Sequence, residues 1–179
     1  NLKTLGVMIA IACSISNQAI AKYQLKYIPG AKIGPGIFTM TNDIELERKL
    51  VPFTRGYVRW GGAGYGVPGV SNVTMNFNNI GIGVRYNLIF FHIGTGIEHS
   101  WLSLNNTQSN YKATGTMLGP VIEIGKSLRL GPVSIGGSLG VQLSKNTIKF
   151  NDTQQFSIGD FKSDSATVFK LECHAGYSF

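Results

Sequence analysis

The chain has 179 residues, 23 glycines, a formal charge of +7 and only 14% charged residues, which favours one glycine-rich β domain over a helical one. No apolar run of about 20 residues occurs beyond the N-terminus, which argues against a polytopic helical membrane protein. The basic residues are scattered, so the charge predicts no nucleic-acid partner and fits a surface that tolerates anionic lipid headgroups.

The first 21 residues have the pattern of a secretory signal peptide. A short basic start precedes the apolar stretch 5–15, and residues 19–21 match an A-x-A cleavage site. We therefore expect a signal peptide over residues 1–21 and a mature domain over residues 22–179. Two alternatives remain open, namely an uncleaved N-terminal anchor helix and a lipoprotein signal that ends at Cys13.

Several segments alternate between apolar and small or polar residues, with the period of two that a β-strand gives to its two faces. In one of them, Ile80 and Ile82 share a face, and Gly81 and Gly83 lie on the other. The longer segments have about ten residues, which is the length of a strand that crosses a membrane at a tilt. In chain order, strands are predicted over residues 22–27, 33–41, 55–65, 79–88, 91–101, 114–124, 133–143 and 167–179.

The connections alternate between longer polar segments and short turns, as in outer-membrane barrels with long external loops. Pro29 and Gly30 are typical of a turn. The charged segment 42–52 does not fit this alternation of loops and turns, because its residues 43–50 look helical and the segment is long for a turn. A six-stranded barrel with an N-terminal plug therefore remains an alternative to an eight-stranded barrel. The longer loops are expected at 66–72, 103–112 and 144–165, and the short turns near Asn87 and at 125–132.

One face of nearly every predicted strand is apolar, while the other carries Gly, Ser, Asn, Arg or Glu. A soluble sandwich would fill its interior with large apolar side chains, and no helices are predicted that could cover the apolar faces from outside. Lipid would cover them directly, and closure would leave no unpaired sheet edge in hydrocarbon. We therefore predict an all-β protein, an antiparallel transmembrane β-barrel of eight strands.

The face that would line the lumen carries charges of both signs. An eight-stranded barrel is about wide enough for side chains to fill, so opposite charges should pair inside it. We expect Arg59 and Arg85 to pair with Glu98 and Glu172, and these pairs would either plug the lumen or rearrange in a narrow gated conduit. The candidates are Arg55, Arg59, Arg85, Glu98, Glu123, Lys170 and Glu172, with His92 and His174.

Glu98, His99 and Ser100 are the residue types of a hydrolase, but consecutive residues of a strand point to opposite faces, so this strand alone cannot bring them together. No metal-ligand spacing occurs, and the G-x-G pairs lie within strands with no helix behind them. We expect no enzyme activity, no catalytic site, no cofactor and no metal. Amphipathic rings favour the membrane interface, and the candidates for such a girdle are Trp60, Tyr86, Trp101, Tyr177 and Phe179.

The signal peptide, the glycine-rich alternating strands and the terminal Phe179 after Tyr177 resemble those of small eight-stranded outer-membrane β-barrels of the OmpA/OmpX type. The resemblance implies a monomer in the bacterial outer membrane, surrounded by lipid and lipopolysaccharide, whose C-terminal strand is recognised by the barrel-assembly machinery. It implies a structural or surface-interaction (adhesin-like) role through extracellular loops that contact an external ligand. A small channel or porin is the alternative, and a lipid-modifying outer-membrane enzyme is less favoured.

Overall fold

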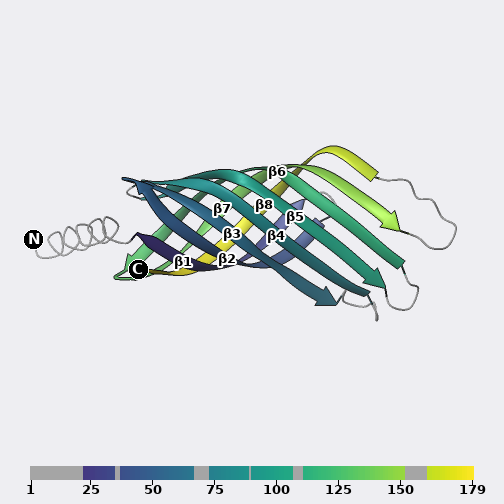
Figure 1. Cartoon of the computed structure of the whole chain (residues 1–179), viewed down its shortest axis with the longest axis horizontal. Helices are drawn as coiled ribbons and strands as arrows, with labels where there is room; N and C mark the ends of the chain where they lie inside the picture. Colours follow the sequence, from purple (N-terminus) through teal and green to yellow (C-terminus); the bar gives the residue numbers. More distant parts are fainter. Residues whose placement is uncertain (1–21, 35–36, 67–72, 89, 107–110, 152–160) are drawn as a thin grey trace, which may run out of the picture.

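The computed structural model describes residues 22–34, 37–66, 73–88, 90–106, 111–151 and 161–179, so the predicted signal peptide lies outside the described residues. The described part is one closed antiparallel barrel in which each strand pairs with the next and the last pairs with the first (Figure 1). The strands are β1 (Tyr23–Gly34), β2 (Ile37–Val51), β3 (Thr54–Gly66), β4 (Val73–Asn87), β5 (His92–Asn106), β6 (Tyr111–Leu130), β7 (Val133–Asn151) and β8 (Phe161–Ser178).

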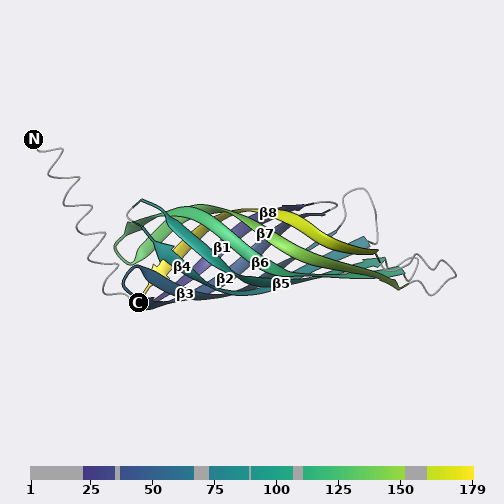
Figure 2. The ribbon, with the colours of Figure 1, turned by 90° about the horizontal axis from the view of Figure 1, so that it is seen from above.

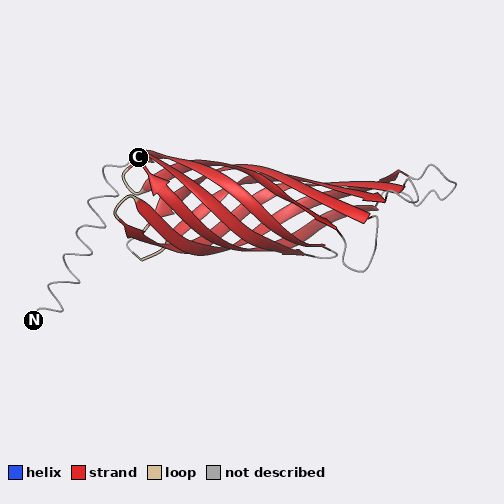
Figure 3. Cartoon of the chain, turned by 90° about the horizontal axis from the view of Figure 1, so that it is seen from below, coloured by secondary structure: helices blue, strands red, loops and turns tan. Residues whose placement is uncertain are grey.

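The barrel is a tube of tilted strands, and its wall is built of strands throughout the described residues (Figure 3). Phe179 and the connections that follow β2, β4 and β6 lie at one end, which we call the turn end; the opposite end is the loop end (Figure 2). Two of these turns use the left-handed backbone region, at Phe53 (φ 65°) and Gly131 (φ 64°). No helix with the length and apolarity needed to cross a membrane occurs among the described residues.

The helical expectation for residues 43–50 and the six-stranded alternative are wrong, because β2 runs through this charged segment and pairs with β3 from Asn42 to Val51. The acidic residues of β2 alternate with apolar ones, so that Asp43 and Glu45 are buried in the lumen while Ile44 and Leu46 are exposed on the outside. Charge on the lumen face, rather than a helical period, explains the composition of this segment.

Two boundaries in the first hairpin also differ from expectation. Pro29 and Gly30 form no turn, because β1 continues through them and pairs with β2 along its whole length. The β1–β8 ladder has a gap at Ile28 and Pro29, where proline has no N–H to donate. The predicted strand over 33–41 is divided between β1, which ends at Gly34, and β2, which begins at Ile37.

The strands extend further at both ends than their alternating pattern suggests. Residues 103–106, 111–112, 144–151 and 161–165 were expected in loops and lie in strands, as do 125–130 next to a tight turn at 131–132. The loop-end rim is uneven, since β1 has 12 residues and β6 has 20 (Figures 1 and 2). Near this rim outward residues such as Lys112, Thr114 and Thr116 are polar, so pairing continues where the apolar outer face has ended.

The large apolar side chains are on the outside of the barrel and the charged ones are inside. Ile82 and Leu139 are 63% and 60% exposed, whereas Glu45 and Arg59 are 0% and 2% exposed. Among the described side chains, a cluster of buried apolar residues lies in the lumen on the loop-end side of the charges, and we call it the apolar plug. The apolar plug consists of Phe77, Met117 and Val168, with Leu102 packed against them.

Candidate functional site: the charged lumen

Buried ionisable side chains from seven strands meet inside the barrel and form what we call the charge network. Each is at most 4% exposed, so the network lies in a medium from which water is largely excluded. Its members are Lys26 and Lys32 from β1, Glu45 and Glu47 from β2, Arg55 and Arg59 from β3, Arg85 from β4, Glu98 from β5, Glu123 from β6, and Lys170 and Glu172 from β8.

Arg59 lies at the centre of the network and reaches three carboxylates. Its Nη1 donates to both oxygens of Glu172 at 2.7 and 2.9 Å, and its Nε and Nη2 donate to Glu45 Oε2 at 3.0 and 2.7 Å. A longer bond of 3.4 Å joins Nη2 to Glu123 Oε2. One guanidinium therefore uses its planar fork to join strands β2, β3, β6 and β8 across the lumen.

Arg85 repeats this arrangement toward the turn end. Its Nη1 lies 2.7 Å from Glu45 Oε1 and also bonds Glu47, and its Nε donates to Glu123 Oε1 at 2.9 Å. Lys26 donates to Glu47 at 2.5 Å and to Glu45 at 3.3 Å. The two arginines therefore share Glu45 and Glu123, so neither ion pair can be moved without disturbing the other.

Toward the loop end the chain of ion pairs continues through two lysines. Lys170 Nζ lies 3.0 Å from Glu172 and 2.6 Å from Glu98, and Lys32 bonds the other oxygen of Glu98. Strand β7 contributes hydrogen bonds in place of charges, from Ser138 Oγ to Glu172 at 3.3 Å and from Gln142 Nε2 to the Glu98 carbonyl at 3.2 Å. All eight strands are thus tied together through the lumen.

Glycines on the lumen face make room for the long side chains. The Tyr57 ring lies 4.9 Å from the Arg85 guanidinium and 5.6 Å from that of Arg59. A Cβ placed on Gly83 or Gly96 would come within 2.5 or 2.6 Å of the Tyr57 hydroxyl. The glycine-rich lumen face is therefore the space into which the network folds.

Charge and packing together close the middle of the barrel. Six cations and six carboxylates are buried among the described side chains, so their formal charges balance. On the loop-end side, the Phe77 ring of the apolar plug covers Lys32 Nζ at 4.9 Å. A hydrated ion moving along the axis would have to separate these pairs and displace the plug, each of which is costly in a low-dielectric interior. The buried charges are Lys26, Lys32, Arg55, Arg59, Arg85 and Lys170 against Asp43, Glu45, Glu47, Glu98, Glu123 and Glu172.

The structure brings the seven sequence-derived lumen candidates into this single network, but not all of the expected pairs. Arg59 does bond Glu172, whereas Arg85 bonds Glu45, Glu47 and Glu123, and Glu98 is held by two lysines. Sequence reasoning did not include five lumen residues, although the alternation of charged and apolar residues along β1 and β2 was a usable signal. The five are Lys26, Lys32, Asp43, Glu45 and Glu47.

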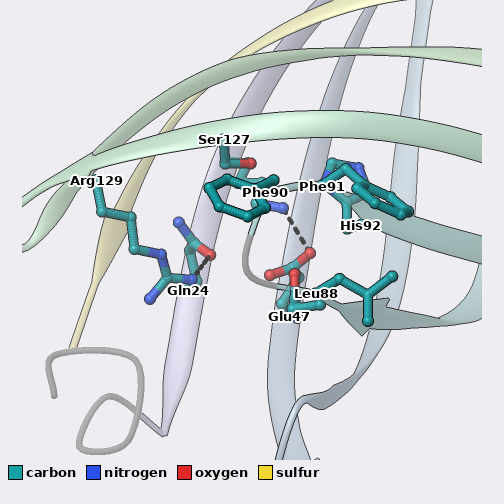
Figure 4. A pocket seen from close by; sticks show the side chains of 10 residues that line it. Gln24, Glu47, Leu88, Phe90, Phe91, His92, Ser127 and Arg129 are labelled. Atoms are coloured by element: carbon teal, nitrogen blue, oxygen red, sulfur yellow. Dashed lines mark hydrogen bonds and ion pairs between the residues drawn. The ribbon is translucent and has the colours of Figure 1, made fainter. Parts of the chain in front are cut away.

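His92 and His174 lie in the lumen near the turn end, with ring centroids 6.4 Å apart. His174 Nε2 is 2.9 Å from Ser127 Oγ. His92 lines an open polar pocket at this end, in which Arg129 donates to Gln24 at 3.0 Å and Lys26 donates to Glu47 (Figure 4). The pocket is where the charge network meets the turn-end mouth of the barrel, and Phe90 and Phe91 lie along its edge.

The hydrolase-like triplet on β5 is divided by the barrel wall. Glu98 and Ser100 are buried in the lumen, where Ser100 Oγ lies 3.4 Å from Glu98 Oε1. His99 is on the outside, its ring 4.3 Å from that of Trp101. The described residues also contain no group of three or more His, Cys, Asp or Glu side chains arranged to hold a metal ion.

The aromatic residues predicted for an interfacial girdle all point outward. Trp60 and Trp101 lie toward the loop-end border of the exposed apolar side chains, on β3 and β5. Tyr86 lies near the turn end of β4 and Tyr177 near the end of β8. Phe179 stacks on the Tyr23 ring at 6.0 Å, which joins the two ends of the described chain at the turn end. The outward apolar surface is therefore bordered by rings at both ends.

The sequence matches no protein-family model and no curated protein. Solved structures do share the fold. A major outer membrane protein from Thermus thermophilus has a TM-score of 0.54 and 16% identity, over 88% of this chain and 99% of that chain. Neisserial surface protein A (NspA) has a TM-score of 0.54 and 12% identity, over 88% and 96%.

The outer membrane protein AlkL, solved in DMPC lipid bilayers, also has a TM-score of 0.54, with 11% identity over 89% of this chain and 90% of that chain. At such identities the likeness establishes the fold alone. The fold of this chain is that of the small outer-membrane β-barrels, and the predicted eight-stranded antiparallel barrel is confirmed.

Proposed function

We propose that this chain is an integral barrel of the bacterial outer membrane whose lumen is closed and whose loop end serves surface interaction, in the manner of an adhesin. The observation that carries the proposal is the reversed distribution of polarity, with an apolar outer surface around a lumen filled by ion pairs. A water-soluble barrel would expose its charges and bury its aliphatic side chains. Lipid is the solvent in which the observed distribution is stable.

Every strand contributes to the proposed lipid-facing surface. One outward apolar representative from each strand is between 38% and 63% exposed, so the apolar surface forms a continuous band around the barrel. A band of this kind, bordered by aromatic rings, is typical of transmembrane barrels. The representatives are Leu25, Leu46, Val58, Ile82, Ile97, Ile122, Leu139 and Leu171.

The closed lumen argues for a scaffold rather than a channel. A channel needs a polar path that water can follow, whereas here the charge network and the hydrogen bonds from β7 link all eight strands, and the apolar plug lies on the loop-end side. We therefore assign the function to the outside of the barrel. Beyond the apolar band, the strands at the loop end carry exposed polar residues, among them Asn105, Lys112, Thr114 and Thr116.

The surroundings of the protein follow from the same geometry. Lys145 is exposed next to Leu143 at the loop-end border of the band, a position suited to a phosphate of lipopolysaccharide. The outward rings of Tyr177 on the final strand and of Phe179 directly after it would be recognised by the barrel-assembly machinery. Closure of the sheet within one chain fits a monomer. Residues 1–21 would direct export and be removed.

The first experiment is membrane fractionation of expressing cells, followed by gel electrophoresis with and without boiling. We expect the protein in the outer-membrane fraction and a mobility change on boiling, because a closed barrel resists the detergent until it is heated. Planar bilayers with purified protein should show no stable conductance. A soluble periplasmic protein without a mobility change would contradict the membrane assignment, and reproducible ion currents would contradict the closed lumen.

The surface role is tested separately, with cells that display the native barrel or a variant whose segments 67–72, 107–110 and 152–160 are replaced by Gly-Ser linkers. Both should show the same boiling-dependent mobility, since the strands are unchanged. Binding to an array of glycans and extracellular-matrix proteins should be lost only in the variant. Equal binding of both forms, or no binding by either, would refute the surface-interaction proposal.

A further inference from the structure

Asp43 differs from every other buried carboxylate of the lumen. It is 0% exposed on β2, and none of the ion pairs among the described residues includes it, whereas Glu47 nearby is paired with Lys26 and Arg85. Its Oδ2 accepts one hydrogen bond, from Asn79 Nδ2 on β4 at 2.9 Å. The cations and anions of the lumen are therefore equal in number but unevenly placed.

The second oxygen of Asp43 and the amide oxygen of Asn79 are acceptors that this hydrogen bond does not use. Asp43 Oδ1 and Asn79 Oδ1 are both buried, and neither has a hydrogen-bond partner among the described residues. Gly61 on β3 lies between them, and a Cβ there would lie 2.6 Å from the Asp43 Cα, so only glycine lets the two side chains meet across the strand. Two acceptors cannot satisfy one another while Asp43 is ionised, and they then require a donor or a cation.

We propose that Asp43 and Asn79 bind a small monovalent cation of the size of Na⁺. A carboxylate and an amide oxygen are the hard ligands that such a cation prefers, and the site has no His or Cys that would favour a transition metal. Because the buried formal charges already balance, a monovalent ion beside Asp43 adds one positive charge to the lumen, and a divalent ion would add two. Water completes the coordination.

The β2–β3 pairing next to this site ends on its loop-end side. The β2–β3 ladder stops at the Asn42–Gly62 pair, beyond which Ile37–Thr41 pairs only with β1 and Ala63–Gly66 pairs only with β4. The lumen face of β2 in this stretch carries Thr39 and Thr41, and the Thr39 hydroxyl has no hydrogen-bond partner among the described residues. A cation would approach Asp43 past these two buried hydroxyls, which are not members of the charge network.

The nearest competitor for Asp43 is the ammonium group of Lys32. In the structure Lys32 bonds Glu98 and lies 3.4 Å from Ser100 Oγ, so it is already held on the far side of the lumen. If Lys32 exchanged Glu98 for Asp43 in solution, no external cation would be needed. The experiment must therefore distinguish bound Na⁺ from this internal exchange.

The test uses the full barrel refolded in a zwitterionic detergent, with thermal unfolding followed by the boiling-dependent mobility change. We expect Na⁺ to raise the unfolding temperature by several degrees over choline at equal ionic strength, saturably, and radioactive Na⁺ to bind at one ion per barrel in equilibrium dialysis. Asp43→Asn should weaken Na⁺ binding at least tenfold and abolish the temperature shift. Asn78→Asp adds one negative charge to the outer face of β4 one residue away and should keep the wild-type response.

Asn79→Asp provides a second, independent variant, because a second carboxylate should change the preference of the site from Na⁺ to Ca²⁺. Equal unfolding temperatures in Na⁺ and choline would overturn the proposal, as would an Asp43→Asn protein that still binds Na⁺. A wild-type response to Ca²⁺ but not to Na⁺ would overturn the assignment of a monovalent ion. If Asp43→Asn does not refold, an unchanged Na⁺ preference in Asn79→Asp refutes the site on its own.

Discussion

Replacing Arg59 by methionine tests whether the charge network stabilises the barrel. Methionine keeps much of the length of the side chain and removes the guanidinium, which makes five hydrogen bonds to Glu45, Glu123 and Glu172. At the usual 1.5–3 kcal/mol for a bond to a charged group, five independent bonds would give roughly 7–15 kcal/mol, more than most domains have in total stability. The bonds are not independent, and the structure shows why.

Each carboxylate that loses Arg59 keeps another cation. Glu45 retains Arg85 and Lys26, Glu123 retains Arg85, and Glu172 retains Lys170. The substitution therefore leaves one uncompensated negative charge spread over three groups. Removal of one partner from a buried ion pair costs about 3–5 kcal/mol, and we expect Arg59→Met to reduce the free energy of unfolding by about 4 kcal/mol.

The measurement is urea unfolding of the refolded barrel in lipid vesicles, followed by the fluorescence of its two tryptophans, Trp60 and Trp101. Arg48→Met is the matched control, because Arg48 is exposed on the outer face and its guanidinium only lies 5.9 Å from the Tyr23 ring. The control should lose no more than about 0.5 kcal/mol. Arg59→Lys, which keeps the charge but not the fork, should lose about 1–2 kcal/mol.

If Arg59→Met and Arg48→Met lose the same small amount, the network does not act as a set of buried ion pairs. The same conclusion would follow if Arg59→Lys were as damaging as Arg59→Met, because shape rather than charge would then be responsible. If Arg59→Met changes how steeply the unfolding free energy falls with urea concentration, the compactness of the barrel has changed. The comparison would then rest on the unfolding midpoints of Arg48→Met and Arg59→Lys.

Three further predictions follow from the plug, the glycines and the outer surface. Phe77→Ala should lower the unfolding free energy by about 3–5 kcal/mol through the cavity it leaves, yet show no conductance in planar bilayers, because the charge network still closes the lumen. Gly83→Ala should cost about 1–3 kcal/mol, because its Cβ would clash with the Thr95 carbonyl oxygen and lie 2.5 Å from the Tyr57 hydroxyl, and near-ultraviolet circular dichroism will detect displacement of the Tyr57 ring as a weakened tyrosine signal. Ile82→Arg should cost about 2–4 kcal/mol in vesicles, whereas Asn76→Arg near the rim should cost at most about 1 kcal/mol, and equal costs would argue against a lipid-facing band.

The barrel itself was predictable because the alternation of residues survives in most strands. The segment from Asn79 to Leu88 carries aliphatic residues or Tyr86 at every second position and Gly, Asn or Arg between them, so the two faces are visible without a structure. β2 was missed because its apolar positions, Ile44 and Leu46, alternate with acids that are common in helices. The period of two was present in β2, but the acids on its lumen face made it hard to recognise.

The partners within the lumen could not be predicted, because alternation gives the face of a residue and not the register of its strand. Arg85 reaches Glu47 and Glu123 from β4, and these contacts depend on the tilt of the barrel and on where each turn begins. The ends of the strands were predicted wrongly for another reason. Residues such as Asn105 and Thr114 pair in the ladder, but their outward side chains are polar, so the apolar outer face that marks the rest of each strand is absent there.

The uneven rim determines how far each hairpin can hold an inserted sequence from the cell. The β1–β2 hairpin turns within two residues, between Gly34 and Ile37, next to the apolar side chains of Ile33 and Phe38. A peptide epitope inserted there would be displayed at lipid level, where an antibody approaches with difficulty. β7 instead continues for eight residues past Leu143, which corresponds to about 26 Å of strand. An epitope inserted after Asn151 would stand clear of surrounding lipopolysaccharide, and the same barrel thus offers both a shielded and an accessible display position.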